Sequence, residues 1–70
     1  MTIKEFKDTI WNDFEFSYNG VWYYICPIDN KYSCGEANHD DTLFSSPNDI
    51  LENFMIQGQP LKNVLSNIIW

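Results

Sequence analysis

The 70-residue sequence contains no arginine, and its four lysines stand against ten aspartate and glutamate residues, which gives a formal net charge of −6. Proteins that bind nucleic acid neutralise phosphate charges with lysine and arginine. This composition therefore argues against direct binding to DNA or RNA. If charge contributes to recognition, the expected partner is another protein, and a basic one.

Long apolar runs are absent as well. No stretch reaches the roughly 18 residues that a membrane-spanning helix needs, and the opening "MTIKEFKDTIW" has no apolar core of the kind found in signal peptides. We therefore expect a cytoplasmic protein without membrane contact. Only two cysteines are present, Cys26 and Cys34, and in a reducing compartment they are expected to be free thiols. A turn of odd length between them would instead place them opposite each other, within reach of a disulfide.

Aromatic side chains, in contrast, are plentiful at 17% of the residues. A chain this short leaves about 40% of its unfolded surface exposed after folding, so its core is thin. Each buried aromatic ring removes roughly 150–250 Å² from water, which compensates for the small size. We expect residues 1–70 to form a single domain.

The first third of the chain predicts a helix followed by a β-hairpin. Thr2 and Glu5 fit a capping box, and the apolar spacing that follows predicts a helix over residues 3–11. In "FEFSYNGVWYYICP" the side chains alternate, and the Asn-Gly pair is typical of a two-residue hairpin turn. This turn sets Tyr18 opposite Val21, with Phe16 opposite Tyr23 and Phe14 opposite Ile25 in the core.

The rest of the chain predicts further strands and two helices. The second strand is expected to end at Pro27, "KYSCGEA" to return beside it, and "TLFSS" to add a short fourth strand. Ser46 and Pro47 are typical of a helix start, Gly58 of a stop, and a last helix is expected from Pro60. The predicted fold is α+β: a three- to four-stranded antiparallel meander, one N-terminal helix and two C-terminal helices, in a two-layer sandwich.

The predicted register turns a second set of side chains to the other side of the hairpin. A solvated face does not need tryptophan and tyrosine, which are enriched at interaction hot spots. We therefore predict partner binding there, unless the N-terminal helix, Trp70 or a second copy covers this side. The predicted contact residues are Glu15, Ser17, Trp22 and Tyr24.

A second candidate surface is acidic. No lysine occurs between Lys31 and Lys62, whereas five acids do: Glu36, Asp40, Asp41, Asp49 and Glu52. Such a region favours solubility, and it also suits a basic partner.

Metal and catalytic chemistry find little support. Cys26, Cys34, His39 and the neighbouring aspartates are competent zinc ligands, but the two cysteines lack the tight knuckle spacing of structural zinc sites. Cys34 and His39 lack an orienting third group, and no phosphate-binding loop or nucleophile elbow occurs. We expect no catalytic residues, no metal and no cofactor.

A resemblance that covers nearly the whole chain rests on the segment "EFSYNG" and on the spacing of residues in the tail: Phe54, Ile56, Gly58, Leu61, Val64, Leu65 and Ile68. The sequence resembles small acidic hypothetical proteins of low-GC Gram-positive bacteria and their phages or mobile elements. The resemblance implies no activity.

These observations favour a non-enzymatic protein-interaction module. Its specific version is an acidic inhibitor whose carboxylates occupy the nucleic-acid groove of a host protein. The alternatives are a homodimer formed through the aromatic sheet face and, more remotely, a small metal- or redox-sensing protein.

Overall fold

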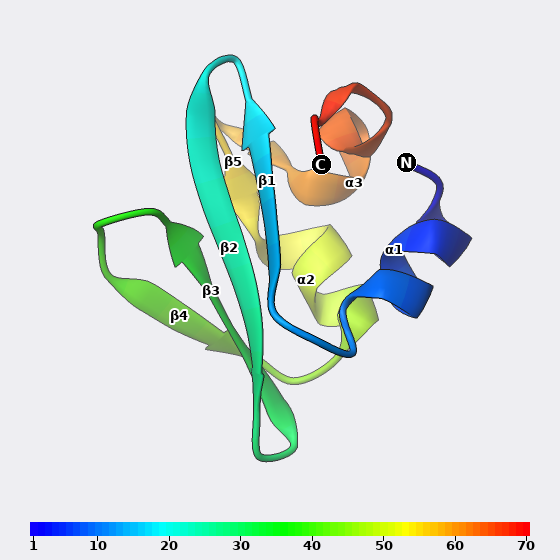
Figure 1. Cartoon of the computed structure of the whole chain (residues 1–70), viewed down its shortest axis with the longest axis vertical. Helices are drawn as coiled ribbons and strands as arrows, with labels where there is room; N and C mark the ends of the chain where they lie inside the picture. The colour runs from blue at the N-terminus through cyan, green and yellow to red at the C-terminus, as the bar shows by residue number, and fades with distance from the viewer.

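The computed structural model describes all 70 residues and shows an α+β fold in two layers (Figure 1). One layer is a four-stranded antiparallel sheet in the order β1-β2-β3-β4. The helices lie on one side of this sheet, together with a separate two-stranded hairpin. The predicted meander and sandwich are confirmed. The elements are α1 (Ile3–Thr9), β1 (Phe14–Tyr18), β2 (Val21–Ile28), β3 (Lys31–Glu36), β4 (Asp41–Phe44), α2 (Pro47–Asn53), β5 (Met55–Ile56), β6 (Gln59–Pro60) and α3 (Leu61–Val64).

The helix starts follow the predicted chemistry. In α1 the Thr2 hydroxyl accepts from the Glu5 N–H, and the Glu5 carboxylate accepts from the Thr2 N–H, which completes the capping box. In α2 the Ser46 hydroxyl accepts from the backbone N–H of Asp49. The helix α1 ends at Thr9, two residues earlier than expected, and leaves Trp11 outside.

The hairpin register is the predicted one, with Phe14 opposite Ile25 and Tyr18 opposite Val21. The second strand ends one residue beyond Pro27, because β2 continues through the proline to Ile28. Pairing with β1 stops at Ile25, so the β1 side of β2 is a free edge from there on. A proline lacks an N–H to donate, and an edge is where a strand tolerates it.

The core lies between the inner face of the sheet and the helices. It contains sixteen buried residues, and several of its aromatic rings contact one another. The rings of Phe16 and Tyr23 are stacked with centroids 5.3 Å apart, and Phe54 meets Tyr23 edge-on at 6.1 Å. The fully buried side chains include Phe6 of α1, Ile50 of α2 and Leu61 of α3. Each helix therefore contributes to one shared core.

A small hairpin, β5 and β6, follows α2 and turns at Gln57 and Gly58, both with positive φ. The Gln57 amide nitrogen donates to the carbonyl oxygen of Tyr18 and to the hydroxyl of Tyr23. Its amide oxygen accepts from Asn19. This hairpin therefore fastens onto the β1–β2 turn, and it does not join the main sheet.

The last helix is shorter than predicted, and the residues after it make a contact with β1 that was not predicted. A 3₁₀ turn, Leu65–Asn67, follows α3, and Ile68 is extended yet still buried. Ile69 then pairs with Ser17 of β1 through two backbone hydrogen bonds of 2.8 Å. No helix is both long and apolar enough to cross a membrane.

Candidate functional site

The side of the sheet turned away from the helices has no covering layer (Figure 1). We call this side the outer face. The strand register assigns to it Glu15, Ser17, Trp22, Tyr24, Cys26, Ile28, Lys31, Ser33, Gly35, Asp41 and Leu43. Ile69 joins the same face, because its bridge partner Ser17 belongs to it and antiparallel partners share a side.

Large apolar side chains gather on the outer face. Eight large hydrophobic side chains of the protein are exposed, and four of them belong to this face: Trp22 at 51%, Ile28 at 51%, Leu43 at 58% and Ile69 at 69%. Leu43 and Ile28 were not among the predicted site residues. Their strand alternation could have identified them, whereas the pairing of Ile69 leaves no signal in the sequence.

The outer face is organised in rows that run across the strands. One row carries Ile69, Ser17 and Trp22. The next carries Glu15, Tyr24, Gly35 and Asp41, and we call it the acidic row. A third row carries Cys26, Ser33 and Leu43. The acidic row therefore lies between two rows that each contain exposed apolar side chains.

Tyr24 leans across the sheet over Gly35. A methyl group added to Gly35 would lie 3.1 Å from the Tyr24 hydroxyl oxygen and 2.8 Å from the backbone oxygen of Asp40. Desolvation, and then the negative charge of Asp41, raises the pKa of the Tyr24 hydroxyl. The centre of the acidic row is therefore tightly packed, and its electrostatic surroundings are negative.

Carboxylates outnumber amines on this side. Glu15 and Asp41 belong to the acidic row, and Asp13 accepts a hydrogen bond of 3.2 Å from the Cys26 thiol. The single amine of the face is Lys31, at the far end beside Ile28. Glu15 has no hydrogen-bond or ion-pair partner in the chain, and Asp41 accepts from the Ser33 hydroxyl.

The four residues predicted to form the sheet contact share a face but differ in exposure. Trp22 and Glu15 are exposed, Tyr24 is half-buried, and Ser17 is buried beside Ile69. Ser17 is therefore not open to a partner. The chain itself does not cover Trp22: α1 lies on the other side of the sheet, and the ring of Trp70 contacts Phe14 of the inner face. Covering by a second copy stays a prediction.

The five acids predicted as a second surface are spread over β3, the β3–β4 turn, β4 and α2, and most have partners within the chain. Glu52 of α2 pairs with Lys62 at 2.8 Å, and Glu36 contacts the His39 ring at 2.7 Å. Asp49 accepts from the Ser45 N–H and from the Asn53 amide, which lowers the pKa of its carboxyl. Asp40 has no side-chain partner.

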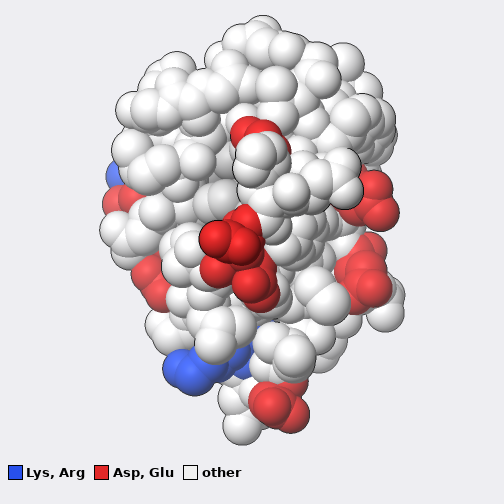
Figure 2. All heavy atoms as spheres, turned by 90° about the vertical axis from the view of Figure 1, so that its left-hand side faces the viewer, with Lys and Arg blue, Asp and Glu red and all other residues white.

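Figure 2 shows one face of this surface, with acidic side chains at several separate positions and lysine near the lower end and at the left edge. The region from residue 36 to residue 52 is therefore not one continuous patch of free carboxylates.

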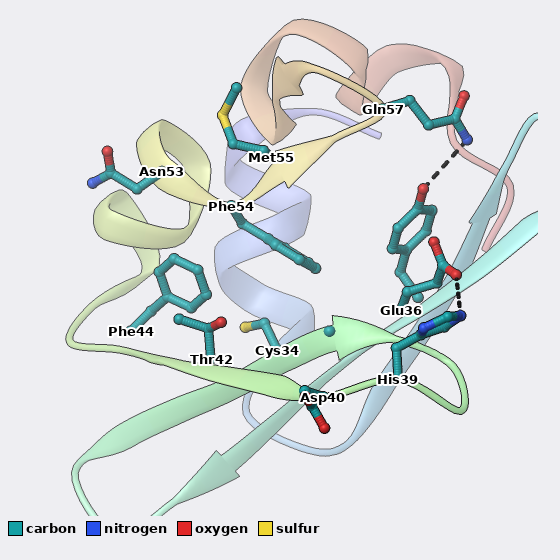
Figure 3. A pocket seen from close by; sticks show the side chains of 12 residues that line it. Cys34, Glu36, His39, Asp40, Thr42, Phe44, Asn53, Phe54, Met55 and Gln57 are labelled. Carbon is teal, nitrogen blue, oxygen red and sulfur yellow. Dashed lines mark hydrogen bonds and ion pairs between the residues drawn. The ribbon is translucent and has the colours of Figure 1, made fainter.

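A cavity of about 740 Å³ opens on the helix side, between the β3–β4 turn and the segment from Asn53 to Gln57 (Figure 3). Cys34, Phe44 and Phe54 line it, whereas the Asp40 side chain points away. Burial raises the pKa of the Cys34 thiol to about 12, so this thiol is not a nucleophile at neutral pH. His39 makes its contact with Glu36 and none with Cys34.

The two cysteines do not face each other. Ile25 is the partner of Cys34, and Ser33 is the partner of Cys26, so the thiols point to opposite sides of the sheet. The turn between the strands, Asp29 and Asn30, has an even length and sets this offset. No three side chains of histidine, cysteine, aspartate or glutamate come together in a geometry that could hold a metal ion.

Comparisons with protein-family models, with curated proteins and with solved structures find no match to this chain.

Proposed function

We propose that this protein is an interaction module that binds a basic partner protein through the outer face. The single observation that carries the proposal is the composition of that face. Half of the exposed large hydrophobic side chains belong to a sheet surface without a covering layer, and carboxylates lie among them. Apolar side chains grouped on one face are typical of contact sites, since scattered ones are the norm elsewhere.

Trp22 is the expected centre of the contact. Its ring is half exposed, because neither Trp70 nor any helix packs on it. Tryptophan is enriched among the residues that dominate binding energy at interfaces. A protein of this size has little apolar surface to spare from its core. Exposure of the ring at such a position is therefore best explained by a role in binding.

The charge of the outer face favours a basic partner over a second copy. A homodimer through this face would bring Asp13, Glu15 and Asp41 of two molecules together, in a protein with a net charge of −6. Like charges in an interface cost binding energy, and opposite charges speed association. A surface with lysine or arginine among apolar side chains complements the face.

The narrower hypothesis, an inhibitor whose carboxylates replace the phosphates of nucleic acid in a host protein, requires free carboxylates. Partners within the chain hold Glu36, Asp49 and Glu52, and Asp41 uses one of its two carboxylate oxygens to accept from Ser33. These contacts argue for apolar binding assisted by charge. Washing the complex with salt separates the two versions, because phosphate mimicry is lost at high ionic strength and an apolar contact persists.

The test is affinity capture from a nuclease-treated bacterial lysate with three baits. They are the wild-type protein, Trp22→Glu, and Trp11→Glu as the matched control. Trp11 is 79% exposed, but it lies on the helix side, where it borders a hollow with Ile10, Pro27 and Tyr32. Both variants place the same new charge on an exposed tryptophan.

We expect a basic protein on the wild-type and Trp11→Glu baits that is absent from the Trp22→Glu bait. Capture that is equal on all three baits would refute binding through the outer face. Light scattering over a range of concentrations tests the homodimer, which requires a mass that rises to that of two chains and falls again in Trp22→Glu.

A further inference from the structure

We infer that the occupant of the outer face is a basic amphipathic helix that lies along the strands with a lysine or arginine between two apolar contacts. The inference rests on the proposed function and specifies the shape and chemistry of the partner. It follows from the order of the rows: an apolar row with Trp22 and Ile69, then the acidic row, then a row with Leu43.

The spacing of the rows matches the repeat of an α-helix. Side chains on one face of a strand recur every second residue, which is about 6.7 Å, so the outer rows are about 13 Å apart. A helix rises about 6 Å in four residues and about 12 Å in eight. Side chains at positions i, i+4 and i+8 of one helix stripe therefore reach the three rows in turn.

The acidic row determines the chemistry of the middle position. Glu15 has no partner in the chain, Asp41 lies at the opposite end of the row, and the aromatic ring of Tyr24 lies between them. A guanidinium or ammonium group placed over this row would lie between a carboxylate at each end, beside the Tyr24 side chain that reaches over Gly35. An acid at the same position would be repelled.

The requirement for satisfied backbone groups favours a helix over an extended segment. A single strand lying flat on this face would leave its N–H and C=O groups against apolar side chains, without hydrogen-bond partners. A helix satisfies these groups internally and presents only side chains. The sheet would then be covered by helices on both faces: its own helices on the inner face and the partner's helix on the outer face.

The test uses synthetic peptides of about 18 residues, held helical by side-chain lactam bridges on the opposite face. The first peptide carries leucine at i, arginine at i+4 and leucine at i+8 in an alanine and glutamine background. The second has glutamate at i+4, and the third has its arginine moved to the opposite face. Binding to the ¹⁵N-labelled protein is followed by amide chemical shifts.

We expect the first peptide to shift amides of β2, β3 and β4 around Tyr24 and Leu43, and to bind at least about tenfold more tightly than the other two. Glu15→Lys should weaken the first peptide by a similar factor. Asp8→Lys is the matched control with the same charge change on an exposed position of α1, and it should bind almost as the wild type does.

Shifts centred on the cavity near Phe44 and Phe54, or equal affinity for all three peptides, would overturn the inference. So would the absence of binding by the first peptide while lysate capture still depends on Trp22, an outcome that leaves the proposed function standing with a partner of another shape. If capture does not depend on Trp22 either, the proposed function itself fails.

Discussion

The inner and outer faces of the main sheet differ in burial, although the same strands form both. On β2, Tyr23 and Ile25 point inward and are almost fully buried, whereas Trp22 on the other side is half exposed. Both sets are apolar, so hydrophobicity alone does not decide which face becomes core. The helices decide it, because α1, α2 and α3 place their apolar sides on one face only.

The comparison teaches that an apolar strand face without a covering layer carries information about binding. Its residues do not stabilise the fold in proportion to their size, because their surface remains in water. Substitutions on the two faces should therefore separate stability from recognition.

The largest difference is expected between Phe16→Ala and Trp22→Ala. Phe16 is fully buried and stacks on Tyr23, so its truncation leaves a cavity and should lower the free energy of unfolding by about 3–5 kcal/mol. Trp22→Ala removes a half-exposed ring and should cost about 1 kcal/mol or less. Urea unfolding followed by circular dichroism measures both. Equal losses would contradict the distinction and make the outer face part of the core.

Gly35→Ala should show where the outer face is itself closely packed. The added methyl group would meet the backbone oxygen of Asp40 at 2.8 Å, and the backbone cannot move aside without disturbing the β3–β4 turn. We expect a loss of about 1–3 kcal/mol in the free energy of unfolding. The double variant Gly35→Ala with Tyr24→Ala relieves only the side-chain contact. Its stability should not return to that of Tyr24→Ala, and full recovery would show that the backbone contact is unimportant.

The two cysteines, one on each face of the sheet, should differ in their reactivity toward thiol reagents. Cys34 is buried on the inner face with a pKa of about 12, and Cys26 is half-buried on the outer face, where the hydrogen bond to Asp13 raises the pKa of its thiol. At pH 8, a thiol reagent should modify Cys26 slowly and Cys34 only after unfolding. Single variants, Cys26→Ser and Cys34→Ala, assign the two rates. Rapid labelling of Cys34 in the native state would contradict its burial.

The Cys34 thiol should make the stability of the protein depend on pH in one direction. The pKa of Cys34 is raised in the folded state, so above the usual value of 9.0 the unfolded chain releases a proton that the folded chain keeps. Stability should therefore fall as pH rises from 9 toward 12, more steeply in the wild type than in Cys34→Ala.

The smallest effects concern single carboxylates on the two sides. The pKa of Asp49 is lowered in the folded state below the ordinary value of 3.8, so its stabilising contribution is present above that pH and is lost as the pH falls below it. Asp49→Asn should lower the thermal midpoint at pH 7, with a difference that shrinks toward pH 3. Glu15→Gln on the outer face removes a carboxylate without a partner and should leave the midpoint unchanged at both pH values. A drop for Glu15→Gln would reveal a structural role.

The sequence predicted the parts of this fold that local chemistry decides. The Asn19–Gly20 turn fixes the hairpin register, and the capping residues Thr2 and Ser46 fix two helix starts. The continuation of β2 through Pro27 was not predictable from local pattern, because it depends on where β1 stops pairing.

The candidate site was predicted in part. Alternation in the hairpin assigned Trp22 and Tyr24 to the outer face, but the exposure of that face depends on where the helices pack, which no local pattern encodes. Ser17 looked available because only the tertiary structure brings Ile69 beside it. The five acids looked like one surface because their hydrogen-bond partners, such as Lys62 for Glu52, lie elsewhere in the sequence.

The pairing of Ser17 with Ile69 has a consequence for the order of folding. All pairs in the main sheet join consecutive strands through short turns, and such local contacts form quickly. The Ser17–Ile69 bridge instead closes a loop that contains most of the chain. Closing so long a loop costs more conformational entropy than closing a hairpin, so this contact forms later. The meander can therefore assemble first, and the row that contains Trp22 is complete only once Ile69 has paired with Ser17.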